Sequence, residues 1–156
     1  MARIVCLSDT LSLVRAIRRE LAGGEHSIHL LPCSRLNDAL RQAVRQAAPD
    51  IVLLELTHTL DNPHIYFFLR ADQATRHVPV VLLSSMPHIE LYADALGADG
   101  FVHTPLNEAE LHVVLDTCLG VRRSFPPHQV PARRRAVSVA RRMVARYPVI
   151  TLPVNT

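Results

Sequence analysis

Several short apolar runs of this sequence end in side chains that could do chemistry. Ser8 and Asp9 follow the first run, Glu55 follows a later one, Ser84 follows another, and Thr104 follows the last. These carboxylates and hydroxyls are groups that bind polar ligands. No Ser-His-Asp grouping with nucleophile-elbow glycines, no phosphate-binding glycine loop and no HExxH motif accompanies them. All 17 basic residues are Arg, so chemistry that depends on a lysine amine at a fixed position is excluded.

Elements that would position these side chains alternate along the first 120 residues. Apolar runs predict strands, and apolar residues at helical spacing predict the helices between them. The expected strands are 3–7, 26–31, 50–56, 78–83 and 101–103, and the expected helices are 11–21, 35–47 capped by Ser34, 63–75, 87–96 and 108–119 capped by Asn107. Because crossovers between parallel strands are right-handed, this order predicts a doubly wound α/β fold with a five-stranded parallel sheet. Ligands of such sheets bind at the carboxyl ends of the strands, where the polar residues lie.

Charge divides the chain into two parts. Residues 1–120 hold nine Arg and all fourteen acids, a balance of −5, whereas residues 121–156 hold eight Arg and no acid, a balance of +8. Three prolines between residues 126 and 131 oppose both helix and sheet. We therefore expect an acidic domain over 1–120, a Pro-rich linker over 121–131 and an Arg-rich basic tail over 132–156.

Four segments of the first 120 residues carry a family resemblance. They are Arg-Ile-Val-Cys-Leu-Ser8-Asp9, Asp-Ile-Val-Leu-Leu-Glu55-Leu, Val-Pro-Val-Val-Leu-Leu-Ser84-Ser85 and Ala-Leu-Gly97-Ala-Asp-Gly-Phe101-Val-His-Thr104-Pro105-Leu. In this order and spacing they resemble the receiver domain of two-component response regulators, which are CheY-like proteins. The resemblance covers nearly all of residues 1–120 and implies the flavodoxin-like fold of that family.

The resemblance also implies a phosphoryl-acceptor pocket. In receivers an Asp after the third strand accepts the phosphoryl group, and together with an acidic pair after the first strand it holds magnesium. A Ser or Thr after the fourth strand and a Lys before the Pro of the fifth bind the phosphoryl oxygens. The equivalents in this chain are Ser8, Asp9, Glu55, Ser84, Thr104 and Pro105. Here Glu55 occupies the acceptor position, Ser8 replaces one acid of the pair, and Thr104 stands where the Lys should be.

These departures predict a pseudo-receiver, which has the fold without normal phosphotransfer. Glu55 is one methylene longer than Asp, and a displacement of about 1 Å from an in-line geometry can cost roughly 10²-fold in rate. We expect no magnesium, no other cofactor and no enzymatic activity. Two interpretations of Glu55 stay open: its permanent carboxylate imitates the phosphorylated state, or it is an acid in a disused pocket.

Receivers bind their partners through the fourth helix, fifth strand and fifth helix, which correspond here to residues 89–96, 101–103 and 108–119. Phe101 matches the aromatic switch residue of the family, although a packing role fits a strand residue equally well. The resemblance therefore implies a signalling module that acts through protein–protein contacts, with a signalling protein or a second copy of the chain as partner.

The basic tail has its own, shorter resemblance. Residues 132–147 are compatible with a helix that is apolar on one side, and Arg141-Arg142-Met-Val-Ala-Arg146-Tyr-Pro-Val-Ile-Thr-Leu-Pro-Val is similar to the entry of a PilZ domain. In that family two Arg, here Arg142 and Arg146, grip cyclic di-GMP. The second PilZ motif is absent before Thr156. Either the chain is part of a longer receiver–PilZ effector or the match is chance; a third alternative is a nucleic-acid-binding adaptor with salt-sensitive affinity.

Composition bounds the class of protein. With 49% hydrophobic and 20% charged residues, the chain is neither disordered nor low in complexity. No apolar run approaches the roughly 20 residues that a membrane span needs. The three cysteines form no CxxC motif and fit neither a disulfide framework nor a zinc site. We therefore expect a soluble cytoplasmic protein.

Overall fold

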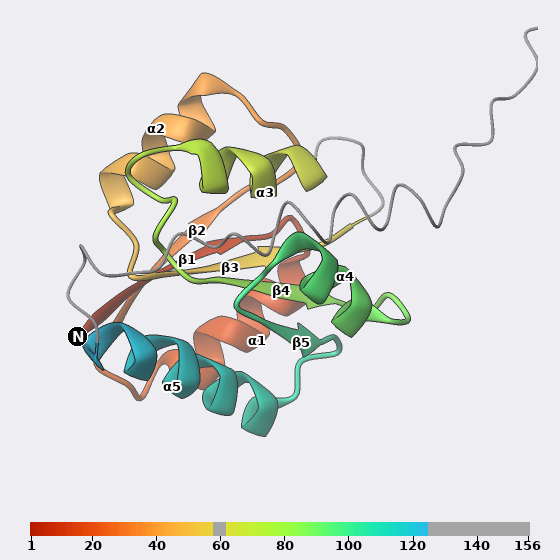
Figure 1. Ribbon diagram of the computed structural model, residues 1–156. Coiled ribbons are helices and arrows are strands. Elements are labelled where there is room, and N and C mark those ends of the chain that lie inside the picture. The colour runs from red at the N-terminus through yellow and green to blue at the C-terminus, as the bar shows by residue number, and fades with distance from the viewer. Residues whose placement is uncertain (58–61, 125–156) are drawn as a thin grey trace, which may run out of the picture.

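A parallel five-stranded sheet organises the computed structural model, which describes residues 1–57 and 62–124. Strands and helices alternate along the whole described chain (Figure 1). The elements are β1 (Ala2–Leu7), α1 (Leu11–Leu21), β2 (His26–Leu31), α2 (Asp38–Ala47), β3 (Ile51–Glu55), α3 (Asn62–Ala71), β4 (Val80–Ser84), α4 (Ile89–Leu96), β5 (Gly100–His103) and α5 (Glu108–Ser124). The strand order β2-β1-β3-β4-β5 confirms the doubly wound α/β fold that the sequence predicts.

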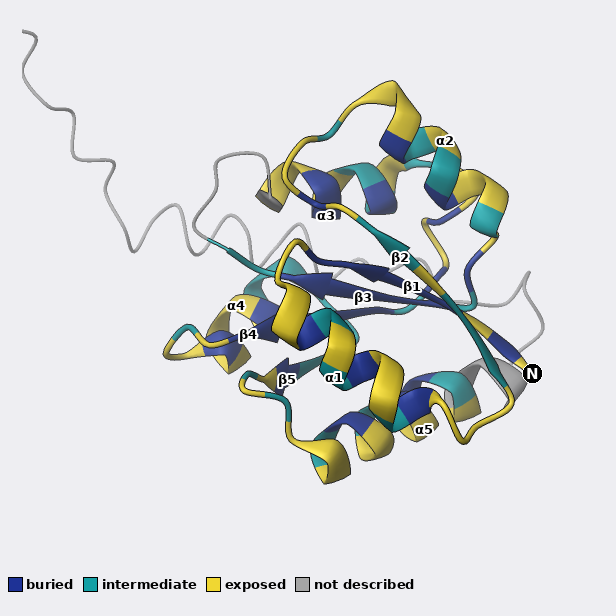
Figure 2. Ribbon diagram, turned by 180° about the vertical axis from the view of Figure 1, so that it is seen from behind, coloured by how far each residue is buried: buried dark blue, intermediate teal, exposed yellow. Residues whose placement is uncertain are grey.

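Apolar side chains that alternate along the inner strands build a core on each face of the sheet. Val5, Val52 and Val80 point to the face that is covered by α2, α3 and α4. Ile4 and Ile51 point to the opposite face, which is covered by α1 and α5. β1, β3 and β4 are buried almost throughout, while the outer sides of the helices are exposed (Figure 2). Burial on both faces explains why these strands are nearly continuous in apolar residues.

Two glycines sit where a side chain would not fit the fold. Gly97 ends α4 with a φ of 71°, a left-handed conformation that glycine adopts without strain. A Cβ on Gly100 would lie 2.9 Å from Cγ1 of Val114. Glycine at this position therefore allows α5 to pack closely against β5.

Several helix boundaries differ from expectation; α4, for example, begins at Ile89 and not at residue 87. α2 begins at Asp38 and not at residue 35, because the side chain of Asn37 accepts a hydrogen bond from the Leu40 amide (2.8 Å), so Ser34 is wrong as the cap. α3 ends at Ala71, and the hydroxyl of Thr75 donates to a carbonyl of its last turns.

α5 continues to Ser124, so the first four residues of the expected linker are helical. A proline disfavours helical conformation at the residue before it. The helix can extend to Ser124 because the first proline of this segment comes only at residue 126. The rest of the expected linker and the whole basic tail lie outside the described residues.

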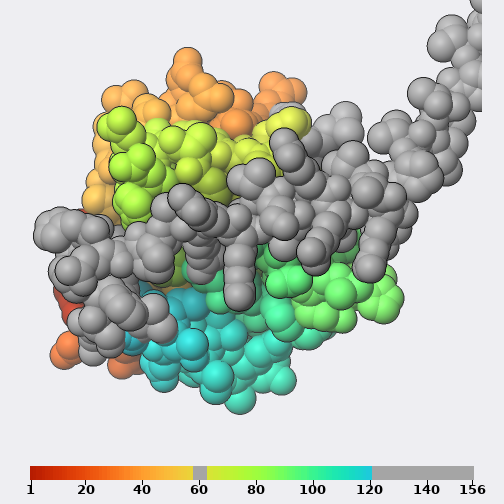
Figure 3. Space-filling view, viewed as in Figure 1, coloured from red at the N-terminus to blue at the C-terminus, as the bar shows by residue number. Residues whose placement is uncertain are grey.

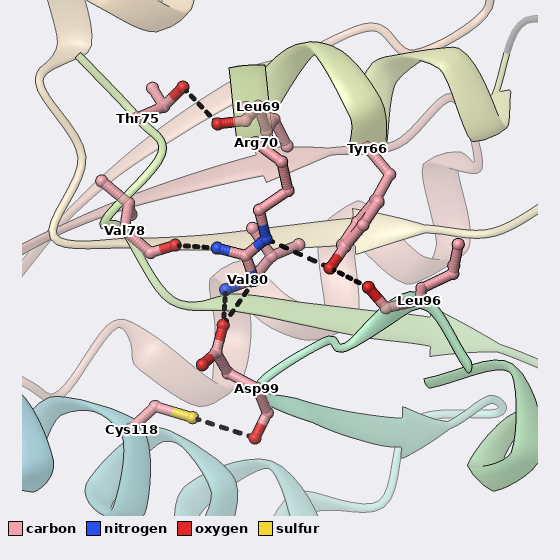
Figure 4. Close-up of polar contacts among 9 residues, drawn as sticks. All are labelled: Tyr66, Leu69, Arg70, Thr75, Val78, Val80, Leu96, Asp99 and Cys118. Carbon is pink, nitrogen blue, oxygen red and sulfur yellow. Dashed lines mark hydrogen bonds and ion pairs between the residues drawn. The ribbon is translucent and has the colours of Figure 1, made fainter. Parts of the chain in front are cut away.

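A polar network fixes the amino ends of β4 and β5 (Figure 4). The guanidinium of Arg70 donates to the carboxylate of Asp99 (2.7 Å), and that same carboxylate oxygen accepts the Val80 amide (2.9 Å). Arg70 also donates to the Tyr66 hydroxyl (3.1 Å), which in turn donates to the carbonyl of Leu96 (2.7 Å). The network joins α3, the end of α4 and the start of β5. The candidate site lies at the opposite end of the sheet, at the carboxyl ends of the strands.

No helix within residues 1–57 and 62–124 is long and apolar enough to cross a membrane.

Candidate functional site

Glu55, the last residue of β3, is the centre of a buried hydrogen-bonded cluster at the carboxyl ends of the strands. Its side chain is almost fully buried, and Oε2 accepts a hydrogen bond from the Ser8 hydroxyl at 2.6 Å. The other oxygen, Oε1, accepts one from the Thr10 hydroxyl at 2.7 Å. Both carboxylate oxygens are therefore held by hydroxyl donors from the loop after β1.

The loop after β1 is shaped to present these two hydroxyls. The Ser8 hydroxyl accepts a hydrogen bond from the Thr10 amide (3.1 Å) while it donates to Glu55. This turn, closed by a serine side chain two residues back, is a common local motif. It orients the Thr10 side chain toward β3, so the charge of Glu55 stabilises the conformation of the loop.

Thr10 is the site residue that the sequence analysis missed. It stands at the N-cap of α1, where a threonine hydroxyl normally accepts a backbone amide, yet it makes no such capping bond. Its hydroxyl donates to Glu55 instead. The signal in the sequence was a second hydroxyl two residues after Ser8, although a threonine just before a helix is ordinarily assigned to capping alone.

Asp9 forms its hydrogen bonds with the segment that follows β2 and not with Glu55. Its Oδ2 accepts hydrogen bonds from the amide (3.2 Å) and the thiol (3.4 Å) of Cys33. Burial above all, and then the charge of Asp9 and its hydrogen bond with the thiol, raise the pKa of Cys33 to about 12. Burial, and after it the charge of Glu55, raise the pKa of the Cys6 thiol in β1 to about 12 as well. Both thiols are therefore protonated at neutral pH and are poor nucleophiles.

Ser84 and Thr104 lie at the ends of the neighbouring strands. The buried Ser84 hydroxyl accepts the Met86 amide (3.0 Å) and donates weakly to the carbonyl of Leu56 (3.4 Å). The amide of Thr104 donates to the carbonyl of Ser84 (2.9 Å), and the peptide bond between Thr104 and Pro105 is cis. β4 and β5 thus place both hydroxyl residues at the same edge of the sheet as Glu55.

Phe101 and His103 lie on the same side of β5, the outermost strand. Phe101 is partly buried and packs against the core beneath α4, and its ring meets that of His103 edge to face at 5.5 Å. The imidazole of His103 lies 3.0 Å from a carboxylate oxygen of Glu110 in α5. The half-buried place of Phe101 suits either of the two roles expected for it.

Solved structures share this arrangement. A receiver domain of a response regulator from Bacteroides fragilis matches with a TM-score of 0.62 and 22% identity, over 74% of this chain and 94% of that one. The chemotaxis protein CheY4 of Vibrio cholerae matches with a TM-score of 0.61 and 18% identity, over 76% of this chain and 99% of its own. The receiver domain of a histidine kinase from Syntrophus aciditrophicus matches with a TM-score of 0.63 and 20% identity, over 81% and 96%. The chain has the receiver fold.

The sequence itself carries a much weaker signal than the fold. No family model matches the chain, and no curated protein matches it in sequence. The three receiver structures bear only on the fold, and the PilZ resemblance, with Arg142 and Arg146, falls outside the described residues.

The carboxylates at this edge of the sheet accept hydrogen bonds from the protein itself. Mg²⁺ requires hard oxygen ligands in near-octahedral geometry, with carboxylates as its usual protein ligands. Here Ser8 offers a hydroxyl and no carboxylate. Each oxygen of Glu55 accepts a hydrogen bond from a hydroxyl group, and Asp9 accepts two hydrogen bonds from Cys33. Within residues 1–57 and 62–124, no three His, Cys, Asp or Glu side chains are grouped as metal ligands would be. The donors present therefore satisfy the carboxylates without a cation.

Proposed function

We propose that this chain is a pseudo-receiver: a signalling module with the receiver fold that binds a protein partner and does not accept a phosphoryl group at Glu55. The observation that carries the proposal is the pair of short hydrogen bonds from Ser8 and Thr10 to the two oxygens of Glu55. A nucleophilic carboxylate needs an oxygen free to attack and a cation to balance the charge on the phosphoryl group. In this pocket each oxygen of Glu55 already accepts a hydrogen bond from a hydroxyl, which makes it a weaker nucleophile, and the sequence holds no Lys that could supply the cation.

In the proposed pseudo-receiver Glu55 has a structural role. Its charge holds the loop after β1 in one conformation through two hydrogen bonds to a charged acceptor, each worth about 1.5–3 kcal/mol when buried. A constant arrangement of this kind fits a partner-binding module whose pocket does not depend on phosphorylation. We therefore favour the disused pocket over imitation of the phosphorylated state, since no Lys is present to transmit such a signal to β5.

Incubation with acetyl phosphate and magnesium, followed by intact-mass measurement, tests the missing phosphotransfer. We expect no added phosphoryl mass on the natural chain. The matched comparison is the triple variant Ser8→Asp, Glu55→Asp and Thr104→Lys, which restores the receiver pattern and should gain the adduct if it folds. A phosphoryl adduct on the natural chain that disappears in Glu55→Gln would overturn the proposal, whatever the triple variant does.

The face built by α4, β5 and α5 is the proposed partner site. Leu91 and Tyr92 on α4 are 56% and 43% exposed, and Val113 on α5 is 65% exposed. Large apolar side chains at such exposure gain free energy when a partner covers them, about 25 cal/mol for each Å² removed from water. A surface that combines three of them on adjoining elements is therefore suited to a protein partner.

Photo-crosslinking tests this surface with an internal control. Phe67 on α3 is also 56% exposed, which makes it a match for Leu91 in size and accessibility. A photoreactive residue at position 91 should give a defined crosslinked species in host cells, whereas one at position 67 should not. Equal yields at both positions would contradict the assignment, and a species of twice the chain mass would identify the partner as a second copy.

A further inference from the structure

The last part of the described domain has an unusual charge distribution. Residues 77–121, which include β4, α4, β5 and most of α5, contain six carboxylates and no Arg. The six are Glu90, Asp94, Asp99, Glu108, Glu110 and Asp116. The next 25 residues, 122–146, contain eight Arg and no carboxylate. Two adjoining segments of the same chain thus carry opposite charge.

Half of these carboxylates already have partners, and the other half lie on the outside of α4 and α5. Asp99 pairs with an arginine of α3, Glu108 with an arginine of α1 at 3.8 Å, and Glu110 with a histidine of β5. Glu90 lies 3.8 Å from an exposed histidine, a contact that is an ion pair only when the histidine is protonated. Asp94 and Asp116 form no side-chain ion pair with any residue of the described part of the chain.

The exposed apolar side chains lie among these carboxylates. On α4, Leu91 and Tyr92 stand between Glu90 and Asp94 in sequence, and on α5 Val113 lies one turn before Asp116. α4 and α5 flank β5 and lie together on one side of the molecule (Figure 3). We call these six residues the α4–α5 face. It combines exposed apolar side chains with exposed carboxylates on the two helices that flank β5, so its complement is a segment that is apolar on one side and basic elsewhere.

We propose that the Arg-rich segment 132–147 of the same chain docks on the α4–α5 face. The sequence spacing of this segment predicts a helix with apolar residues on one side and six Arg over the rest. The apolar residues are Ala136, Val139, Ala140, Met143 and Val144, and the arginines are Arg133, Arg134, Arg135, Arg141, Arg142 and Arg146. The segment has no acid that would be repelled by Asp94 or Asp116.

The chain between the two parts is long enough for this contact. At a rise of about 1.5 Å per helical residue, Asp116 lies about 12 Å before the end of α5 at Ser124. Seven residues, 125–131, separate Ser124 from the basic segment and can span up to about 25 Å when extended. Short linkers give effective concentrations in the millimolar range, so contacts too weak for two separate molecules are sufficient here.

Docking would regulate the proposed function, because it covers the apolar centre of the proposed partner site. Only this consequence rests on the proposed function; the docking itself does not. A partner would have to displace the basic segment, and an anionic competitor for the arginines would release the face. Surface ion pairs contribute about 0–1 kcal/mol each and weaken with salt, which makes such a contact reversible.

Paramagnetic relaxation on the full-length chain tests the docking. A nitroxide is attached to Ser138→Cys; the native cysteines, Cys6, Cys33 and Cys118, are buried and so are spared. We expect the label to broaden backbone amides of α4 and α5 more than those of β2, at the far edge of the sheet. Raising the ionic strength to about 1 M, where the screening length is about 3 Å, should abolish this selectivity.

Two variants make the result specific to the face. Asp94→Asn combined with Asp116→Asn should lower the broadening at α4 and α5 at least about two-fold. Glu25→Gln, an equally exposed acid just before β2, should leave it unchanged. A uniform pattern, a preference for other elements or an unchanged double variant would overturn the proposal.

A mixed sample separates docking within one chain from docking between chains. When a ¹⁵N-labelled chain without nitroxide is mixed with an unlabelled chain that carries it, we expect no broadening. Broadening there would overturn the assignment to the same chain. None of these measurements involves a phosphoryl donor or a partner, so their failure leaves the pseudo-receiver proposal intact, and an adduct on Glu55 would leave the docking intact.

Discussion

The hydrogen bond from Thr10 to Glu55 makes a sharp prediction about stability. Replacing Thr10 with Val keeps the branched shape and removes only the hydroxyl. Because that hydroxyl does not cap α1, the change costs no helix-capping bond. The substitution removes an O–H donor that lies 2.7 Å from Oε1 of Glu55. Glu55 is only 9% exposed, so water replaces this donor poorly.

The magnitude follows from the charge and burial of the acceptor. A hydrogen bond to a charged group contributes about 1.5–3 kcal/mol, compared with about 0.5–1.5 kcal/mol for a neutral pair. Thr10→Val should therefore lower the free energy of unfolding by about 2 kcal/mol. Glu55→Gln should cost a similar amount, since the amide presents an N–H₂ donor where a hydroxyl now donates. The two losses should overlap, with a coupling energy of about 1–2 kcal/mol in the double variant.

Urea unfolding of the two single variants, the double variant and the natural chain measures this coupling. Thr117→Val is the control, since the exposed Thr117 hydroxyl donates to a carbonyl one turn back in its own helix, and its removal should cost less than about 0.5 kcal/mol without coupling to Glu55. If the effects of Thr10→Val and Glu55→Gln add to within about 0.3–0.5 kcal/mol, the hydroxyl does not act on the carboxylate and the proposed role of Glu55 fails.

Three further predictions concern other parts of the fold. Ala48→Gly should raise the unfolding free energy by about 1 kcal/mol, because Ala48, the C-cap of α2, has a φ of 43°. Ala47→Gly, at the last helical residue of α2, should lower the unfolding free energy by up to about 0.5–1 kcal/mol, and changes of the same sign in urea titrations would contradict this. Cys33 keeps its proton up to about pH 12 when folded, but its thiol ionises near pH 8.5 when unfolded, so the unfolded state loses its proton first and stability falls as pH rises through this window. Cys33→Ala should therefore remove about 2 kcal/mol of the stability loss between about pH 8 and 10, and an unchanged pH dependence would count against the raised pKa. Asp99→Asn and Arg70→Met should be coupled by about 1–3 kcal/mol in a double-mutant cycle, since their ion pair is mostly buried; additive losses would show that it contributes little.

The sheet and its order could be predicted because the inner strands leave little choice. Residues 51–54 are all apolar and all buried, which only a strand covered on both faces explains well. The positions of Ser8, Glu55, Ser84 and Thr104 followed from the same pattern, since each stands where an apolar run stops. Parallel strands then bring these side chains to one edge.

The details of the site could not be predicted, because they depend on competition among local hydrogen bonds. Thr10 has two partners within reach, a helix amide and a carboxylate, and only the placement of Glu55 in three dimensions decides between them. Asp9 likewise accepts a hydrogen bond from Cys33, which is 24 positions away in the sequence. The Cys33 amide comes within reach of Asp9 only when β2 pairs with β1. The sequence analysis placed the cap of α2 at Ser34, whereas Asn37 caps the helix; serine and asparagine are similarly good caps, so residue type alone does not separate them.

The three departures from the receiver pattern are physically consistent with one another. A pocket with three carboxylates is stable only when a cation and a Lys offset their repulsion. In the proposed pseudo-receiver, Thr104 stands at the position of the Lys and Ser8 at the position of one carboxylate, which removes the repulsion that the cations would have offset. The remaining two carboxylates are separated in function: Glu55 binds two hydroxyl donors and Asp9 binds Cys33. Restoring only one of the lost groups should therefore destabilise the pocket, because each replacement is favourable only in the presence of the others.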